Sequence, residues 1–252
     1  MECFRIIYLR EGLYNKANNC FEKFLKLTEG TRYKRETFQL YRNLALSEYN
    51  LARTESIRKR ELLYSSIENS NNALRCRNID PTSPEFTSKD LAVFIARFNR
   101  SQTLVEREEE EDIKFAIKEL KNLNKSIPEL LSTQRSQKHW KGNIITQLIK
   151  SYSFLSEKEK VKLLMNELKE IYFSFENSEI EKQRFGIQNA TENLQSILTI
   201  ALEKKILEVN DELYNQLSEL HQRISNLTQK IPKISLRDWS KYIYEIEKIF
   251  LT

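Results

Sequence analysis

Apolar side chains recur along this chain at intervals of three and four residues, the spacing that places them on one face of an α-helix. Three stretches share one phrase: a small or branched residue, a large apolar residue four positions later, and another three positions after that. The phrase is formed by Ala17, Phe21 and Phe24, by Ala116, Leu120 and Leu123, and by Val161, Met165 and Leu168. A helical phrase that recurs in this way predicts an array of helical hairpins.

The same spacing predicts individual helices over residues 3–9, 15–27, 33–53, 55–78, 91–105, 113–123, 140–152 and 156–173. Within the helix over 55–78, Ile57, Leu62 and Leu63 fall on the stripe that is expected to face the core. Pro128 is expected to end the helix that precedes it, because proline lacks the N–H group that a helix interior uses.

Helix starts are predicted where a hydroxyl or carboxylate side chain can accept a hydrogen bond from the first backbone N–H groups. Three pairs have the spacing of a capping box: Thr87 with Asp90, Ser156 with Glu159, and Ser178 with Glu181. The acidic run over 106–112 precedes an apolar stripe, which predicts a helix start or a hairpin tip. A docking patch for a basic partner is the alternative for this run.

The pattern changes after residue 180. Between about 180 and 231 the chain contains no proline and only one glycine, Gly186. Leu213, Leu220 and Leu227 are seven residues apart and alternate with Leu217, Ile224 and Ile231. So short a heptad seam predicts a long helical hairpin packed within the fold, with an independent coiled coil as the alternative. After Pro232, a terminal amphipathic helix is predicted to start at Ser235 and Asp238 and to carry Trp239, Tyr242, Ile243, Ile246 and Phe250.

The stretch from Tyr8 to Phe21 resembles the tetratricopeptide repeat, in which an aromatic residue, a turn glycine, an alanine and a second aromatic residue interlock two antiparallel helices. The resemblance implies that Ala17 lets the helices approach and that Phe21 fills the gap between hairpins. The segment from Ala116 to Pro128 resembles the second half of another unit, and residues 43–45 resemble a first helix. The aligned positions Ala17, Ser66, Ala116 and Val161 are 49, 50 and 45 residues apart, longer than the roughly 34-residue standard unit.

These patterns predict an all-α protein, an α-solenoid of antiparallel helical hairpins with a long-helix C-terminal part. Residues 1–175 are expected to form the tetratricopeptide-like array. Residues 176–252 are expected to form a long hairpin and a terminal helix that caps the array, because the last unit of an open stack must be covered.

Composition narrows the possible chemistry. The four glycines of the 252-residue chain are isolated, so no glycine-rich phosphate-binding loop is present. His139 and His221 are the only imidazoles, and the three cysteines form no C-x-x-C pair, so we expect neither catalysis nor a metal or other cofactor. No apolar run approaches the roughly 20 residues that cross a bilayer, so no membrane contact is expected. The unpaired cysteines favour a reducing, cytoplasmic location.

A basic stretch with interleaved tyrosines occupies residues 32–77, although the net charge of the chain is only +5. Basic side chains beside aromatic rings can hold a single-stranded nucleic acid by phosphate contacts and base stacking. The simpler interpretation is that the tyrosines face the core while the basic residues line a solvated helix face.

Two hypotheses for function follow, and an enzyme of unfamiliar design is a third, less favoured one. The first is a non-enzymatic scaffold or adaptor subunit whose concave groove holds a peptide or helix of another protein, as the resemblance implies. Its candidate residues are Asn15, Asn43, Tyr49 and Arg53. The second is a subunit that contacts RNA or single-stranded DNA in a ribonucleoprotein or defence-type complex. Its candidate residues are Arg53, Arg58, Lys59, Arg60, Arg75 and Arg77.

Overall fold

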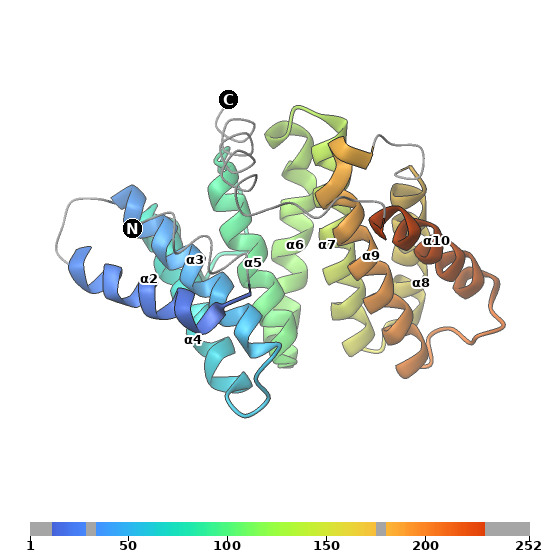
Figure 1. The fold of residues 1–252 in the computed structure, drawn as a ribbon, viewed down its shortest axis with the longest axis horizontal. Coiled ribbons are helices and arrows are strands. Elements are labelled where there is room, and N and C mark those ends of the chain that lie inside the picture. The colour runs from blue at the N-terminus through green and yellow to red at the C-terminus, as the bar shows by residue number, and fades with distance from the viewer. Residues whose placement is uncertain (1–11, 29–33, 175–179, 230–252) are drawn as a thin grey trace. The chain divides into compact units, whose positions relative to one another are not determined.

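The computed structural model describes residues 12–28, 34–174 and 180–229 (Figure 1). Within these ranges the chain forms helices and no strand, which confirms the predicted all-α class. The helices are α2 (Tyr14–Thr28), α3 (Lys34–Ala52), α4 (Lys59–Cys76), α5 (Leu91–Arg107), α6 (Glu110–Leu130), α7 (Gln134–Phe154), α8 (Lys158–Phe173), α9 (Ile180–Glu203) and α10 (Glu212–Gln229). The helices predicted over 3–9 and 235–250, and Ser178 of the third capping box, lie outside the described residues.

The chain divides into two compact units, Met1–Leu130 and Leu131–Thr252. We call them unit 1, which contains α2 to α6, and unit 2, which contains α7 to α10. The boundary expected from the sequence, at residue 175, lies between α8 and α9 of unit 2.

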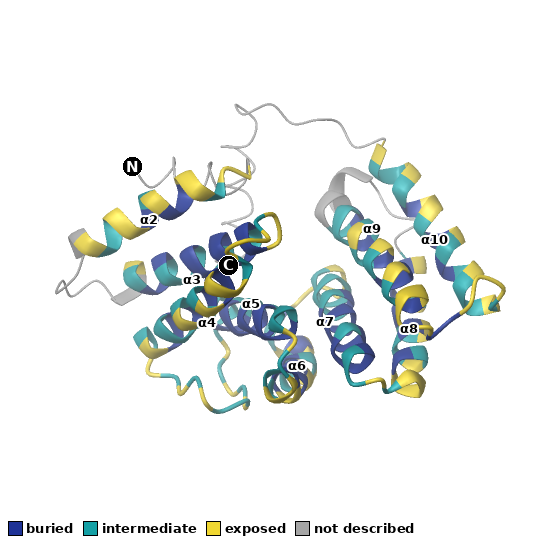
Figure 2. Cartoon of the chain, turned by 90° about the horizontal axis from the view of Figure 1, so that it is seen from below, coloured by how far each residue is buried: buried dark blue, intermediate teal, exposed yellow. Residues whose placement is uncertain are grey.

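In unit 1 each helix packs on the next one along the chain, and α3 also contacts α5. Ala17 and Phe21 of α2 are fully buried and pack against Leu40 and Leu44 of α3. Farther along, α3, α4 and α5 share a core around Phe38, and α4, α5 and α6 share one around Leu104. In Figure 2 the buried faces of α3 and α5 turn towards their neighbours. Eight of the nine residues of the recurring phrase are buried in their units, and Phe24 is partly buried.

The described residues of unit 2 form two helical hairpins, α7–α8 and α9–α10. Helix α7 contacts both α8 and α9, and α10 contacts both α9 and α8. The Lys158 ammonium donates to the Lys205 carbonyl at 2.8 Å, and the Lys169 ammonium donates to Gln216 Oε1 at 2.8 Å. In both contacts the two residues are 47 positions apart in the sequence. Because the offset is the same at both ends of α8, α8 and α10 run in the same direction.

A glycine allows one close approach inside unit 2. Gly142 of α7 faces the ring of Tyr172 on α8, and a Cβ atom at position 142 would lie 2.6 Å from Tyr172 Cε1. The ring therefore occupies the volume that any side chain at position 142 would need. Glycine is used here although it weakens a helix interior by about 1 kcal/mol relative to alanine.

Two predicted details of the helix ends differ in the structure. Pro128 lies inside α6, which continues to Leu130, because the ring removes one hydrogen bond only two residues before the helix ends. Ile57 lies in the turn before α4 and is 97% exposed, so its predicted core position is wrong.

Two predicted capping boxes also differ. The N-cap of α5 is Asp90 rather than Thr87, and its carboxylate accepts from the Ala92 N–H at 2.8 Å. Ser156 has a φ of 60°, which is incompatible with the extended backbone of an N-cap, and α8 begins instead after Glu157. The acidic run forms a hairpin tip as predicted, with Glu108 in the left-handed conformation between α5 and α6.

Candidate functional site

The turn between α3 and α4 gathers several of the residues that the sequence had marked. The backbone N–H groups of Thr54 and Glu55 donate to the Leu51 carbonyl at 3.0 and 2.9 Å, and the Thr54 hydroxyl donates to the same oxygen at 2.9 Å. These bonds close the end of α3 and direct the chain into the segment 53–58. Asn15 on the first turn of α2 donates to Glu55 Oε1 at 3.2 Å, which ties α2 to this turn.

Six candidate residues therefore lie at this end of unit 1, which we call the turn surface. They are Asn15, Tyr49, Arg53, Arg58, Lys59 and Arg60. The other candidates lie elsewhere: Asn43 is in the middle of α3, and Arg75 and Arg77 are at the far end of α4. Asn43 accepts a hydrogen bond from Arg42 at 3.3 Å, and Arg77 lies 4.9 Å from the centre of the Phe38 ring.

Aromatic rings lie beside two guanidinium groups of the turn surface, those of Arg53 and Arg60. The Arg53 guanidinium lies 5.9 Å from the centre of the Tyr49 ring, which is itself buried. Burial raises the pKa of Tyr49 to about 12, so the phenol stays neutral. Arg60 and Arg107 lie 5.7 and 3.9 Å from the centre of the Tyr64 ring. Such contacts stabilise by about 0.5–1 kcal/mol each where they are exposed.

Carboxylates neutralise two of the four cations of the turn surface, Arg58 and Lys59. Arg58 donates to both oxygens of Glu61, at 3.2 and 3.1 Å. The Lys59 ammonium lies 2.6 Å from Glu106 on the next hairpin. Arg107 pairs with Glu109 and with Asp112. At the far end of α4, Arg75 pairs with Glu68 at 2.9 Å. These internal pairs compete with phosphate groups for the cations, since binding to a nucleic acid relies on uncompensated positive charge.

Apolar side chains project from the same surface. Ile57 is 97% exposed, and Tyr64 and Leu13 are also exposed. Leu13 directly precedes α2, whose first turn Asn15 joins to Glu55. The turn surface thus combines an exposed isoleucine with arginine, tyrosine and ion pairs. Tyrosine and arginine are enriched in the contact centres of protein–protein interfaces.

Comparisons with protein-family models, curated proteins and solved structures found no match. The interpretation of the turn surface therefore depends on its geometry alone. Measured against the thickness of a bilayer, every helix of the described residues is too short or too polar to span it. Among the same residues, His, Cys, Asp and Glu side chains form no group of three or more that could hold a metal ion.

Sequence patterns did not reveal a buried charge cluster in unit 1. Glu119 of α6 is fully buried, and Arg97 and Arg100 of α5 are 3% and 2% exposed. Arg97 donates to Glu119 Oε1 at 2.8 Å, Arg100 donates to both carboxylate oxygens, and the Ser101 hydroxyl donates to Oε2 at 2.7 Å. Arg97 also donates to the Ser83 carbonyl at 2.7 Å. The hydrogen bonds of the cluster connect the α4–α5 connection to α5 and α6. Its role is therefore structural.

A second buried carboxylate lies where α3 faces α4. Glu48 is 5% exposed and accepts hydrogen bonds from the Ser65 hydroxyl at 2.6 Å and from Asn69 Nδ2 at 2.8 Å. Burial raises the pKa of Glu48 to about 7, although both hydrogen bonds act in the opposite direction. The carboxyl group of Glu48 therefore titrates near neutral pH rather than in its usual acidic range.

Unit 2 contains a chain of hydrogen bonds that links three of its helices. Asn193 of α9 donates to Asn143 Oδ1 of α7 at 2.9 Å and to the Tyr172 hydroxyl of α8 at 2.7 Å. Asn143 Nδ2 lies 3.3 Å from His139 Nε2, which requires an unprotonated ring nitrogen as acceptor. Burial and the nearby cation of Arg135 lower the pKa of His139 to about 4. The imidazole is therefore neutral at pH 7, as this chain of hydrogen bonds requires.

Proposed function

We propose that the chain is a non-enzymatic interaction module, a stack of helical hairpins that binds another protein as an adaptor or scaffold subunit. The observation that carries the proposal is Ile57, which is 97% exposed at the turn surface. Burying an isoleucine side chain stabilises a complex by about 1.5–3 kcal/mol, so a fully exposed one gives a partner a large apolar contact.

The spacing of the hairpins supports the stacked architecture. The two hairpins of unit 2 contact each other through residues 47 and 50 positions apart. The aligned positions Ala17, Ser66, Ala116 and Val161 of the sequence are 45 to 50 residues apart. Stacks of hairpins with a constant offset typically use their extended surfaces to bind other proteins.

The charge distribution favours a protein partner over a nucleic acid. Arg58, Lys59 and Arg75 each form an ion pair within unit 1. A phosphate backbone would have to break these pairs. A protein partner could contact Ile57 with an apolar side chain and the neighbouring residues with polar groups. Such a partner would leave the ion pairs of unit 1 intact. We therefore propose that the partner supplies an apolar pocket which receives Ile57.

The test is affinity purification of the tagged full-length chain from its native cell, with half of each sample treated with nuclease. We expect a stoichiometric protein partner that survives nuclease and is lost with Ile57→Asp. Val209→Asp is the matched control, since Val209 is 60% exposed in unit 2, and it should retain the partner.

Ile57→Asp should leave the helical content unchanged, because substitutions at exposed positions usually alter stability by less than about 0.5 kcal/mol. A partner that Ile57→Asp retains would refute the role of the turn surface. Partners lost with nuclease, together with co-purifying RNA or DNA, would favour the nucleic-acid hypothesis instead.

A further inference from the structure

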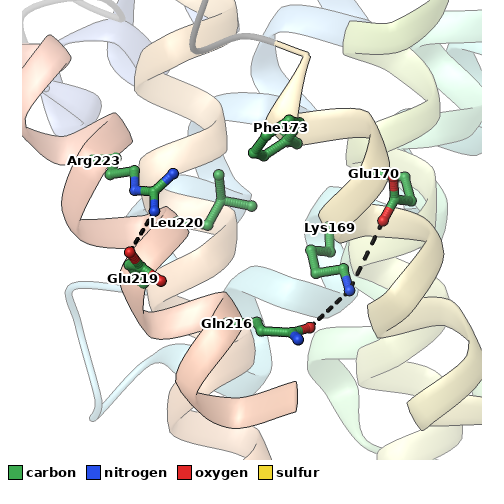
Figure 3. Close-up of a pocket in the computed structure, with 7 residues that line it drawn as sticks. All are labelled: Lys169, Glu170, Phe173, Gln216, Glu219, Leu220 and Arg223. Carbon is green, nitrogen blue, oxygen red and sulfur yellow. Dashed lines mark hydrogen bonds and ion pairs between the residues drawn. The ribbon is translucent and has the colours of Figure 1, made fainter. Parts of the chain in front are cut away.

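Charged side chains line the groove between α8 and α10 of unit 2, and they are paired with one another or with a neighbouring amide (Figure 3). Lys169 donates to Gln216 at 2.8 Å and lies 3.8 Å from Glu170. Arg223 pairs with Glu219 along α10. A charged ligand in this groove would have to break these contacts. Cations without such a counter-ion lie instead at the turn surface of unit 1.

Arg53 and Arg60 are the two cations of the turn surface that no carboxylate neutralises. Both residues are exposed, and neither forms an ion pair with any described residue. Their guanidinium groups lie beside the rings of Tyr49 and Tyr64. A guanidinium group beside a ring keeps its planar fork of N–H donors, which matches the two oxygens of a carboxylate. Arg53 and Arg60 can therefore each form a two-pronged contact with an acidic group of a partner.

The carboxylate that acts on Arg60 is bound to other groups. Glu109 pairs with Arg107 and accepts from the Tyr64 hydroxyl at 3.1 Å. The hydrogen bond from Arg107 lowers the pKa of Glu109, and Arg60 adds to this shift only through space. Glu109 therefore leaves the N–H donors of Arg60 without a carboxylate contact.

Ile57 lies between the two arginines in the sequence, four residues after Arg53 and three before Arg60. Glu55 is the one acidic residue between them, and it accepts from Asn15 at 3.2 Å. The turn thus displays an apolar side chain between two cations that lack a counter-ion. A nucleic acid carries a charge on every phosphate of its backbone and would bring phosphates against Glu55 as well. A protein surface can place its negative charge at two points alone.

We propose that the partner is acidic where it binds the turn surface, and that carboxylates on the rim of the pocket which receives Ile57 pair with Arg53 and Arg60. This inference rests on the proposed function, because it states the chemistry of the partner that binds there. Complementary charges across an interface speed association and fix the orientation of the partner. Ile57 then supplies the apolar contact, while the arginines select an acidic partner over a neutral one of the same shape.

The first test replaces both arginines in the tagged full-length chain. Partners are purified from the native cell with and without nuclease, and only those lost with Ile57→Asp are counted. Arg53→Gln combined with Arg60→Gln should reduce the recovery of such a partner by about 2- to 30-fold, the range expected for two exposed ion pairs. Arg75→Gln combined with Lys125→Gln is the control. It removes the same charge from exposed positions outside the turn surface and should leave the recovery unchanged.

The second test identifies the group that each arginine contacts. Arg53→Lys and Arg60→Lys each introduce an amine, which a carbodiimide joins to a carboxylate in direct contact with it. We expect cross-links from positions 53 and 60 to Asp or Glu side chains of the partner, located by mass spectrometry. The Lys59–Glu106 pair, at 2.6 Å, is the internal control, because the same reagent should join it in every sample.

The outcomes separate this inference from the proposed function. If no partner depends on Ile57, both are refuted. A partner that depends on Ile57 but is fully recovered with Arg53→Gln and Arg60→Gln overturns the acidic contact alone. Lys59–Glu106 cross-links without any cross-link from positions 53 and 60 to the partner also overturn it. A nuclease-sensitive partner that is lost with the two arginines assigns them to phosphate groups and overturns the acidic protein contact.

Discussion

Replacing Glu119 with glutamine should destabilise unit 1 strongly. The carboxylate is fully buried and is the only acidic side chain that Arg97 and Arg100 contact in the described structure. Glutamine keeps the volume but removes the charge, which leaves two buried guanidinium groups without the carboxylate that they contact. Removing one partner of a buried ion pair typically costs about 3–5 kcal/mol. The remaining hydrogen bonds to backbone carbonyls of the α4–α5 connection do not supply a negative charge, and the carboxylate of Asp80 acts on both guanidinium groups without an ion-pair contact.

The measurement is amide hydrogen exchange, followed on peptides from α5 and α6 so that unit 2 does not contribute. A loss of about 3–5 kcal/mol accelerates exchange through unfolding of unit 1 by between about one hundredfold and a few thousandfold. The control is Glu111→Gln on the same helix. The Glu111 side chain is 87% exposed and pairs with Lys114, so its loss should cost less than about 0.5 kcal/mol.

A companion variant separates the charge from the packing. Replacing Arg97, Arg100 and Glu119 together with methionine, leucine and leucine removes all the buried charges at once. Apolar replacements of buried ion clusters are often neutral or stabilising. We expect this triple variant to exchange more slowly than Glu119→Gln. If Glu119→Gln exchanges like the Glu111→Gln control, or if the triple variant is equally damaged, then uncompensated charge is not what the carboxylate prevents.

Two pH dependences of opposite sign follow from the buried titratable groups. The pKa of His139 is lowered to about 4, so between pH 4 and 6.5 the unfolded chain binds more protons than the folded chain. The free energy of unfolding of unit 2 should therefore fall by up to about 3 kcal/mol as the pH falls through this range. Exchange of α7 peptides should show this slope, and His139→Gln should reduce it, leaving the smaller contribution of His221, whose pKa burial also lowers. The pKa of Glu48 is raised to about 7, so the folded chain binds more protons between pH 4.5 and 7, and unit 1 should lose stability as the pH rises. Glu48→Gln should raise the stability of α3 and α4 above pH 7 by up to about 3 kcal/mol, and an unchanged pH profile of those peptides would contradict the assignment.

The spacing of apolar residues predicted the helices. An amphipathic helix buries residues at intervals of three and four, and this pattern is visible within each helix's own sequence. Ala116, Leu120 and Leu123 are all fully buried on one face of α6. The spacing placed Ile57 wrongly in the core. Ile57 continues the apolar spacing of α4 but lies before the first residue of that helix, because the hydrogen bonds to the Leu51 carbonyl end α3 and leave a turn before α4.

The candidate site was predictable only in part, for a related reason. The sequence marked Asn15, Tyr49 and Arg53, and the fold brings them to one end of unit 1. It could not show that Lys59 pairs with Glu106, because that contact joins two hairpins 47 residues apart. Nor could it distinguish Arg97 from a surface arginine, since both have the same local pattern and only the packing of α5 on α6 buries it.

The close approach of Gly142 to Tyr172 restricts how this sequence can diverge. A larger residue at position 142 requires a smaller one at position 172, and that change removes the hydroxyl that accepts from Asn193. The three positions lie on α7, α8 and α9 and are tied by sterics and by a hydrogen bond, so they should vary together among related chains. A search that weights this coupled trio, rather than overall identity, is a physically grounded way to recognise distant relatives of unit 2.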